Sequence, residues 1–309
     1  MTRIPQEPAV STRFLYQDAL ADLADVPAAS RWARSGPSGE VSLHLLDYGG
    51  DGVPLVVLPG ITSPAVTMDF VARELTDLVR PLVLDVRGRG LSDDGHSYDL
   101  ESYAADTEAV IQELGLERPI LFGHSMGARI AAATAVRAKV ALRGSVLVDP
   151  PMSGPAREPY PTTLAAFLGQ LEQAQRGTDA DEVARAWPRW PRREQGLRAR
   201  WLASCGEEAL RATHRGFETE DFFDWWPGVP TPVTMLYGSD SPVVTSAGAE
   251  EAARTNAAAG LVAVPDSGHM VFWDNPDVAL AAAREAIGGV LAADQYIPGT
   301  ADSPPGGRV

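Results

Sequence analysis

A serine and a histidine occupy positions suited to acyl transfer. Ser125 lies in a G-x-S-x-G segment at 123–127. A serine hydroxyl becomes a strong nucleophile when a neighbouring base takes its proton, so Ser125 requires a histidine partner. Among five histidines, His269 follows the last expected strand, where the chain order serine, acid, histidine places the base. We therefore predict Ser125 as nucleophile and His269 as general base.

Two aspartates compete to be the acid that orients His269. Asp149 ends an apolar run at 145–148, and Asp240 ends another at 233–237. Either place in the chain can present a carboxylate to the Nδ1–H group of the histidine. The G-x-D-x-P pattern around Asp240 favours that residue, yet the residues alone leave both candidates open.

An acyl-transfer site also needs two backbone N–H groups that stabilise the developing oxyanion. The residue after the nucleophile, Met126, supplies one of them. The loop after the apolar run 55–58 reads Pro-Gly-Ile-Thr-Ser, so we predict the Ile61 N–H as the second donor. Gly60 in that loop allows the backbone to approach the substrate closely, and we count it among the substrate-binding residues.

Short apolar strands alternate with helical patterns around these residues. Strands are expected at 55–58, 82–86, 120–122, 145–148, 233–237 and 261–264, and helices at 68–78, 103–114, 126–138 and 277–293. Apolar strands that alternate with helices are typical of a mostly parallel α/β sheet covered on both faces. Ser125 then lies on a turn from strand to helix, as a nucleophile elbow requires.

The chain divides into a core, an insertion and two terminal segments. Residues 1–39 are expected to form an N-terminal extension with a short helix, and 40–150 with 229–295 the α/β core. Residues 151–228 lack a convincing strand and hold five of the seven tryptophans, which predicts a helical cap inserted between strands. Residues 296–309 are rich in Pro and Gly and are expected to form a flexible tail.

Charge and composition exclude several classes of protein. The 309 residues carry 26 Lys and Arg against 41 Asp and Glu, a net charge of −15, which argues against partners such as nucleic acid or an anionic membrane. An apolar fraction of 45% is too high for a disordered chain. With a single cysteine, no secretory signal and no run of 18 apolar residues, we expect a cytoplasmic protein.

At these motifs the chain resembles the α/β-hydrolase superfamily, and within it the N-formylmaleamate deformylases of nicotinate degradation. The resemblance rests on segments 58–65, 84–92, 123–129, 148–155 and 197–202. It implies that the acid is the aspartate of the V-D-P-P segment, Asp149. It further implies hydrolysis of an N-formyl amide through an acyl-enzyme, on a small and possibly anionic substrate such as N-formylmaleamate.

An anionic substrate needs a cation in the pocket, and three arginines lie close to the motif segments: Arg87, Arg129 and Arg157. Of these, Arg129 and Arg157 are the candidate substrate-binding residues. No cofactor is expected, and no metal, since no His, Cys and Asp residues stand at ligand spacing. The expected partner is a small molecule, with a homo-oligomer contact through the extension or the cap.

Three other functions remain open. A carboxylesterase or lactonase would use every one of the same catalytic residues, and a C–C bond hydrolase of aromatic degradation would also use serine, histidine and aspartate. A ligand receptor without catalytic activity on the same fold would typically have lost part of the triad. Substrates, rather than residues, separate the two enzymatic alternatives.

Overall fold

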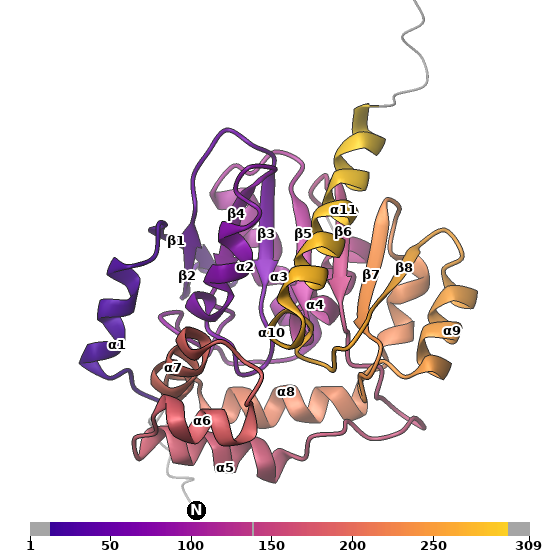
Figure 1. The fold of residues 1–309 in the computed structure, drawn as a ribbon. Coiled ribbons are helices and arrows are strands. Elements are labelled where there is room, and N and C mark those ends of the chain that lie inside the picture. The colour runs from indigo at the N-terminus through magenta and orange to yellow at the C-terminus, as the bar shows by residue number, and fades with distance from the viewer. Residues whose placement is uncertain (1–12, 138, 296–309) are drawn as a thin grey trace, which may run out of the picture.

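The computed structural model describes residues 13–137 and 139–295. Within these residues, eight strands form one sheet in the order β1-β2-β4-β3-β5-β6-β7-β8. β2 pairs antiparallel with both β1 and β4, and the pairs from β4 to β8 are all parallel. The predicted mostly parallel α/β sheet is therefore confirmed (Figure 1).

The strands occupy the following ranges: β1 (Ala29–Ser35), β2 (Val41–Asp47), β3 (Pro54–Leu58), β4 (Arg80–Leu84), β5 (Ile120–His124), β6 (Gly144–Val148), β7 (Val233–Gly238) and β8 (Gly260–Val264). The central strands β5 and β6 are buried along their whole length, which explains the apolar runs 120–122 and 146–148 within them. Neighbouring residues of one strand face opposite sides of the sheet. Val56 accordingly packs in one hydrophobic cluster and Val57 in the other.

Helices cover both faces of the sheet. The longer helices of the core are α3 (Leu100–Glu113), α4 (Met126–Arg137), α9 (Ser246–Thr255) and α11 (Pro276–Gln295), and the short ones are α1 (Gln17–Ala21), α2 (Asp69–Arg73) and α10 (Val271–Asp274). In Figure 1, α2 and α11 lie in front of the sheet, with α3 and α4 behind it. The expected helix 68–78 is shorter than predicted, because beyond Arg73 the chain continues in turns.

The predicted boundary at residue 39 is wrong, since the sheet begins at Ala29. β1 pairs with β2 along its whole length, although most of its residues are exposed. An edge strand in contact with solvent carries charged residues and lacks the apolar run of a central strand. The expected short helix is present as α1. It packs against the inserted segment, where Arg200 forms a 2.6 Å ion pair with Asp22.

Residues 151–228 lie between β6 and β7 and hold helices and connecting loops without a strand. The α-helices of this insertion are α5 (Leu164–Gln175), α6 (Ala180–Ala186), α7 (Arg192–Trp201) and α8 (Glu207–Thr219). In Figure 1 these four helices lie together at one end of the sheet. Residues of α5 and α7 line the same pocket as Ser125, so the insertion covers the edge at which the parallel strands end. The expected tail 296–309 lies outside the described residues.

Candidate active site

Ser125 lies on a tight turn between β5 and α4. Its φ of +56° is a backbone conformation that non-glycine residues rarely adopt. The flanking glycines make this turn possible. A Cβ atom at Gly127 would stand 1.8 Å from the Leu58 carbonyl oxygen, and one at Gly123 would stand 2.1 Å from the Gly127 carbonyl oxygen. The G-x-S-x-G pattern is therefore required by the packing of the turn against β3.

The structure joins Ser125, His269 and Asp149 through two hydrogen bonds. The Nε2 atom of His269 lies 2.9 Å from Oγ of Ser125, and Nδ1 lies 2.7 Å from Oδ2 of Asp149. His269 belongs to the loop between β8 and α10, and Asp149 follows the last residue of β6. An imidazole held in this way can accept the serine proton at Nε2 while the carboxylate fixes its tautomer.

Asp240 lies away from this chain of hydrogen bonds. It is exposed, and its carboxylate accepts a 3.3 Å hydrogen bond from the hydroxyl of its neighbour Ser239. Asp149, by contrast, is fully buried and accepts further hydrogen bonds from the Gly238 N–H and the Ser241 hydroxyl. Of the two candidate acids, the structure brings only Asp149 to the histidine.

The loop that follows β3 packs directly against Ser125. A Cβ atom at Gly60 would stand 3.4 Å from Cβ of Ser125, in van der Waals contact with it. Two arginines hold the next two carbonyl groups: Arg89 donates to the Ile61 oxygen at 3.1 Å and Arg198 to the Thr62 oxygen at 2.6 Å. These hydrogen bonds fix the peptide planes of this loop, whose Ile61 N–H is the predicted second oxyanion donor.

Met126 is the first residue of α4, so its N–H belongs to the helix end that has no intrahelical acceptor. The partial positive charge at a helix N-terminus favours negative charge at that point. Ile61 and Ser125 both line the pocket beside it. The N–H groups of Ile61 and Met126 therefore remain the two candidate oxyanion donors.

His124 lies against His269. Its ring centroid is 5.2 Å from that of His269, and its Nε2 atom donates a 3.0 Å hydrogen bond to the His269 backbone carbonyl. Burial lowers the pKa of His124 to about 3, so the ring is neutral at pH 7. Its hydrogen bond therefore holds the His269 loop through a neutral side chain.

A pocket opens directly above Ser125 and His269. Its lining residues come from the loop after β3, from the turn after β5, from the inserted segment and from the His269 loop: Gly60, Ile61, Thr62, Ser63, His124, Ser125, Tyr160, Thr162, Phe167, Gln170, Trp187, Trp190, Arg198, His269 and Met270. Sequence reasoning missed Tyr160, whose hydroxyl lies 3.3 Å from Nε2 of His269. It also missed Arg198, although that residue lies in segment 197–202, on which the resemblance rests in part.

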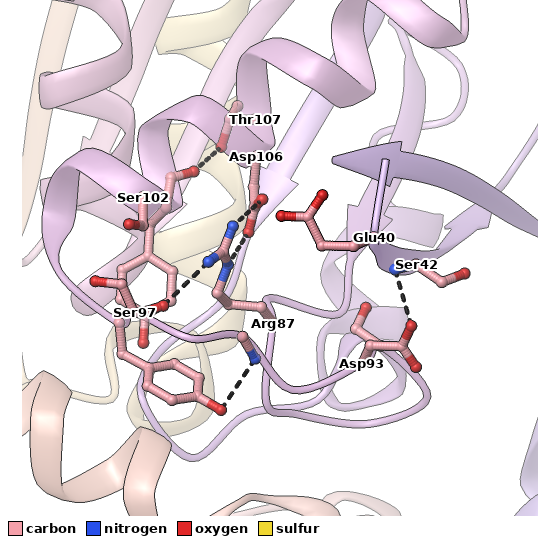
Figure 2. Close-up of polar contacts among 12 residues, drawn as sticks. Glu40, Ser42, Arg87, Asp93, Ser97, Ser102, Asp106 and Thr107 are labelled. Carbon is pink, nitrogen blue, oxygen red and sulfur yellow. Dashed lines mark hydrogen bonds and ion pairs between the residues drawn. The ribbon is translucent and has the colours of Figure 1, made fainter. Parts of the chain in front are cut away.

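The arginines named from the sequence are engaged elsewhere. Arg87 forms two 2.5 Å hydrogen bonds with the carboxylate of Asp106, and Figure 2 shows its guanidinium turned toward that residue. Arg129 is buried beneath the insertion, where it donates to the Glu220 carbonyl. None of these arginines lines the pocket at Ser125, so the expectation that Arg129 contacts substrate is wrong.

Arg157 is held by two carboxylates at once. Its Nε atom lies 2.8 Å from Asp221 and its Nη1 atom 2.9 Å from Glu251. Hydrogen bonds to both partners raise the pKa of this guanidinium. The predicted substrate contact of Arg157 is therefore wrong as well, because its charge is already neutralised by neighbours within the protein.

In the parts of the chain that the structure describes, no three His, Cys, Asp or Glu side chains gather as a metal-binding group. None of the described helices combines the length and the apolar character needed to cross a bilayer.

Comparison with known proteins identifies relatives along most of the chain. A model described as "Alpha/beta hydrolase family" matches residues 55–283. The chain is 38% identical over 236 residues to N-formylmaleamate deformylase of Pseudomonas putida, which covers 76% of this chain and 88% of the relative. It is 28% identical over 278 residues to 2-(acetamidomethylene)succinate hydrolase of Mesorhizobium japonicum. That alignment covers 85% of this chain and 98% of the relative.

A solved structure gives the same result. The crystal structure of an N-formylmaleamic acid deformylase from Pseudomonas putida superposes with a TM-score of 0.77 at 34% identity, and covers 82% of this chain and all of that one. Together these matches confirm the resemblance inferred from the motifs.

Proposed function

The chain belongs to the alpha/beta hydrolase family, and two of its relatives are named for the hydrolysis of small amides; we propose that it is a serine hydrolase that removes a formyl group from an N-formyl amide such as N-formylmaleamate. The chain is an enzyme that hydrolyses amide or ester bonds. The observation that carries the finer proposal is the unbroken path of hydrogen bonds from Ser125 through His269 to Asp149.

The first half of the reaction forms an acyl-enzyme. His269 takes the proton of the Ser125 hydroxyl at Nε2, and Oγ attacks the formyl carbon. Asp149 stabilises the imidazolium that results. The carbonyl oxygen becomes an oxyanion, which accepts hydrogen bonds from the N–H groups of Ile61 and Met126. Each such donor contributes about 3 kcal/mol to lowering the barrier.

Collapse of this intermediate breaks the bond between the formyl carbon and the amide nitrogen. His269 gives its proton to the leaving nitrogen, which departs as a primary amide, and Ser125 is left as a formyl ester. Water then enters, loses a proton to His269 and attacks the same carbon. The second intermediate releases formate and returns the proton to Ser125.

The side chains that line the pocket suit a small substrate with both apolar and polar groups. Aromatic side chains of the insertion, Phe167, Trp187 and Trp190, form its apolar wall. Tyr160 lies next to the base, and burial raises the pKa of its phenol, so the hydroxyl stays protonated and can donate to a substrate atom near Ser125. A small planar amide has both apolar contact and hydrogen-bond donors available here.

The similarity to the deformylase supports the particular bond. That relative acts on N-formylmaleamate by its name, and the second relative is named for hydrolysis of an acetamido compound. Both names describe amides with a short carbon chain. This shared chemistry favours the N-formyl amide over a neutral ester as the substrate of this chain.

Formate detection tests the proposal directly. Purified enzyme is incubated with N-formylmaleamate, and formate is measured by a coupled formate dehydrogenase assay, with Ser125→Ala as the control. We expect formate in equimolar amount to the substrate consumed, and a loss of at least about 10³-fold in kcat with Ser125→Ala. Turnover of p-nitrophenyl acetate or a lactone, without formate from the N-formyl amide, would contradict the proposed substrate.

A further inference from the structure

The pocket above Ser125 holds one guanidinium and no carboxylate. Among the described residues that line it, Arg198 is the single Lys or Arg, and none is Asp or Glu. The acidic group of the site, Asp149, does not line the pocket and is hydrogen-bonded to His269. In a chain with a net charge of −15, the cavity at the nucleophile is therefore lined by positive charge.

Neutral groups hold the Arg198 guanidinium in place. Its Nη1 atom donates to the Thr62 carbonyl oxygen at 2.6 Å, and its Nη2 atom donates to Oε1 of Gln170 at 2.8 Å. A guanidinium has five N–H donors, so three of them have no acceptor among the described residues. Arg198 itself lines the pocket together with Thr62 and Gln170, so its guanidinium is beside the space that a substrate enters.

The charge of Arg198 has no carboxylate partner among the described residues. Burial lowers its pKa to about 10, and no nearby carboxylate raises it. The adjacent Cys205 supplies no counter-charge at pH 7, because burial raises the pKa of its thiol to about 11. Arg157, with its two carboxylates, is the contrasting case, since its pKa is raised. A desolvated cation of this kind gains most from an anion that enters the pocket.

We propose that Arg198 binds a carboxylate of the substrate and so restricts this enzyme to short anionic amides. This inference rests on the proposed function and names its substrate class. The carboxylate takes the free donors of the guanidinium, and the scissile carbonyl lies at Ser125 in the same pocket. Arg198 also holds the Thr62 carbonyl, beside the Ile61 N–H, so it links substrate binding to the position of the oxyanion loop.

A matched pair of substrates tests this role. N-formylmaleamate and its methyl ester share the scissile bond and differ in the carboxylate charge. With Arg198→Gln we expect kcat/KM for N-formylmaleamate to fall about 10- to 100-fold, mainly through KM, as when a charged hydrogen bond is lost. For the methyl ester we expect less than about a threefold change. Arg198→Lys keeps the charge and should recover part of the loss.

Arg192→Gln is the control from the same helix. Its side chain is 61% exposed and pairs with the exposed Asp181, so both substrates should be turned over as by the unmodified enzyme. If Arg198→Gln lowers turnover of both substrates equally, the arginine only positions the loop, and the inference is overturned. An unchanged KM for N-formylmaleamate in Arg198→Gln overturns it too.

Calorimetry with the product maleamate separates binding from catalysis. Maleamate is titrated into the Ser125→Ala protein with and without Arg198→Gln, and we expect the second substitution to raise Kd at least about tenfold. Equal Kd values, or no binding of maleamate to the Ser125→Ala protein, overturn the inference. If maleamate binds through Arg198 while the active enzyme releases no formate, the proposed function fails and the anion site stands.

Discussion

The hydroxyl of Ser241 donates a 2.6 Å hydrogen bond to Oδ2 of Asp149, the same oxygen that lies 2.7 Å from Nδ1 of His269. The second oxygen of the carboxylate accepts from the Gly238 N–H at 3.0 Å. Donors on both oxygens prevent the carboxylate from rotating away from the histidine. The end of β7 and the turn after it therefore hold Asp149, which follows β6, whereas Asp240 in that same turn is exposed.

The roles of the two aspartates can be separated by substitution. Asp149→Asn should lower kcat for formate release by about 10³- to 10⁴-fold, because an amide in place of the carboxylate favours the wrong tautomer of His269. Asp240→Asn should leave kcat within about twofold, since that side chain is exposed. Steady-state kinetics of both variants provides the measurement. Loss of turnover only in Asp240→Asn would show that the acid is assigned to the wrong residue.

Arg157 should matter for stability and not for substrate binding. Arg157→Ala removes the ion pairs with Asp221 and Glu251 and should lower the free energy of unfolding by about 1–3 kcal/mol. KM for N-formylmaleamate should not change. Urea denaturation and kinetics measure the two effects. The control is Arg176→Ala, whose exposed pair with Glu172 should contribute less than about 0.5 kcal/mol; a raised KM in Arg157→Ala would contradict its assignment as structural.

The buried His124 should make stability fall in mild acid. Burial holds its pKa at about 3, whereas the unfolded chain takes up this proton near the ordinary value of 6.5. Between those values the unfolded state binds one proton more, so the free energy of unfolding decreases as the pH falls, by up to about 1.4 kcal/mol per pH unit. His124→Asn removes this contribution. Urea denaturation at several pH values from neutral down to about 5 should give a shallower dependence for the variant, and equal slopes would refute the assignment.

The glycine that closes the turn at Ser125 should tolerate no side chain. Gly127→Ala places a Cβ atom against the Leu58 backbone oxygen, so we expect a loss of more than about 3 kcal/mol or failure to fold. Gly169→Ala, inside α5 and with open space around it, should instead stabilise the protein by about 0.5–1 kcal/mol. Thermal unfolding of both variants tests the pair. A soluble Gly127→Ala protein of unchanged stability would contradict the packing argument.

The sequence by itself determined the features that depend on near neighbours. The buried strands β3, β5 and β6 carry uninterrupted apolar runs, and the two glycines around Ser125 mark a turn that leaves no room for side chains. The position of His269 after the last strand followed from chain order. These patterns were sufficient for the fold class and for two of the three residues that the structure joins by hydrogen bonds.

Only the tertiary structure decided which of several equivalent residues reaches the site. Asp149 and Asp240 both follow strand ends, but a φ of +48° turns Asp149 toward the histidine loop. The sequence did not predict the edge strand β1, because this strand lacks an apolar run and is held in the sheet by its pairing with β2. Arg198 reaches the pocket because α7 packs over a loop 136 positions earlier in the chain, and no local pattern encodes a contact of that range.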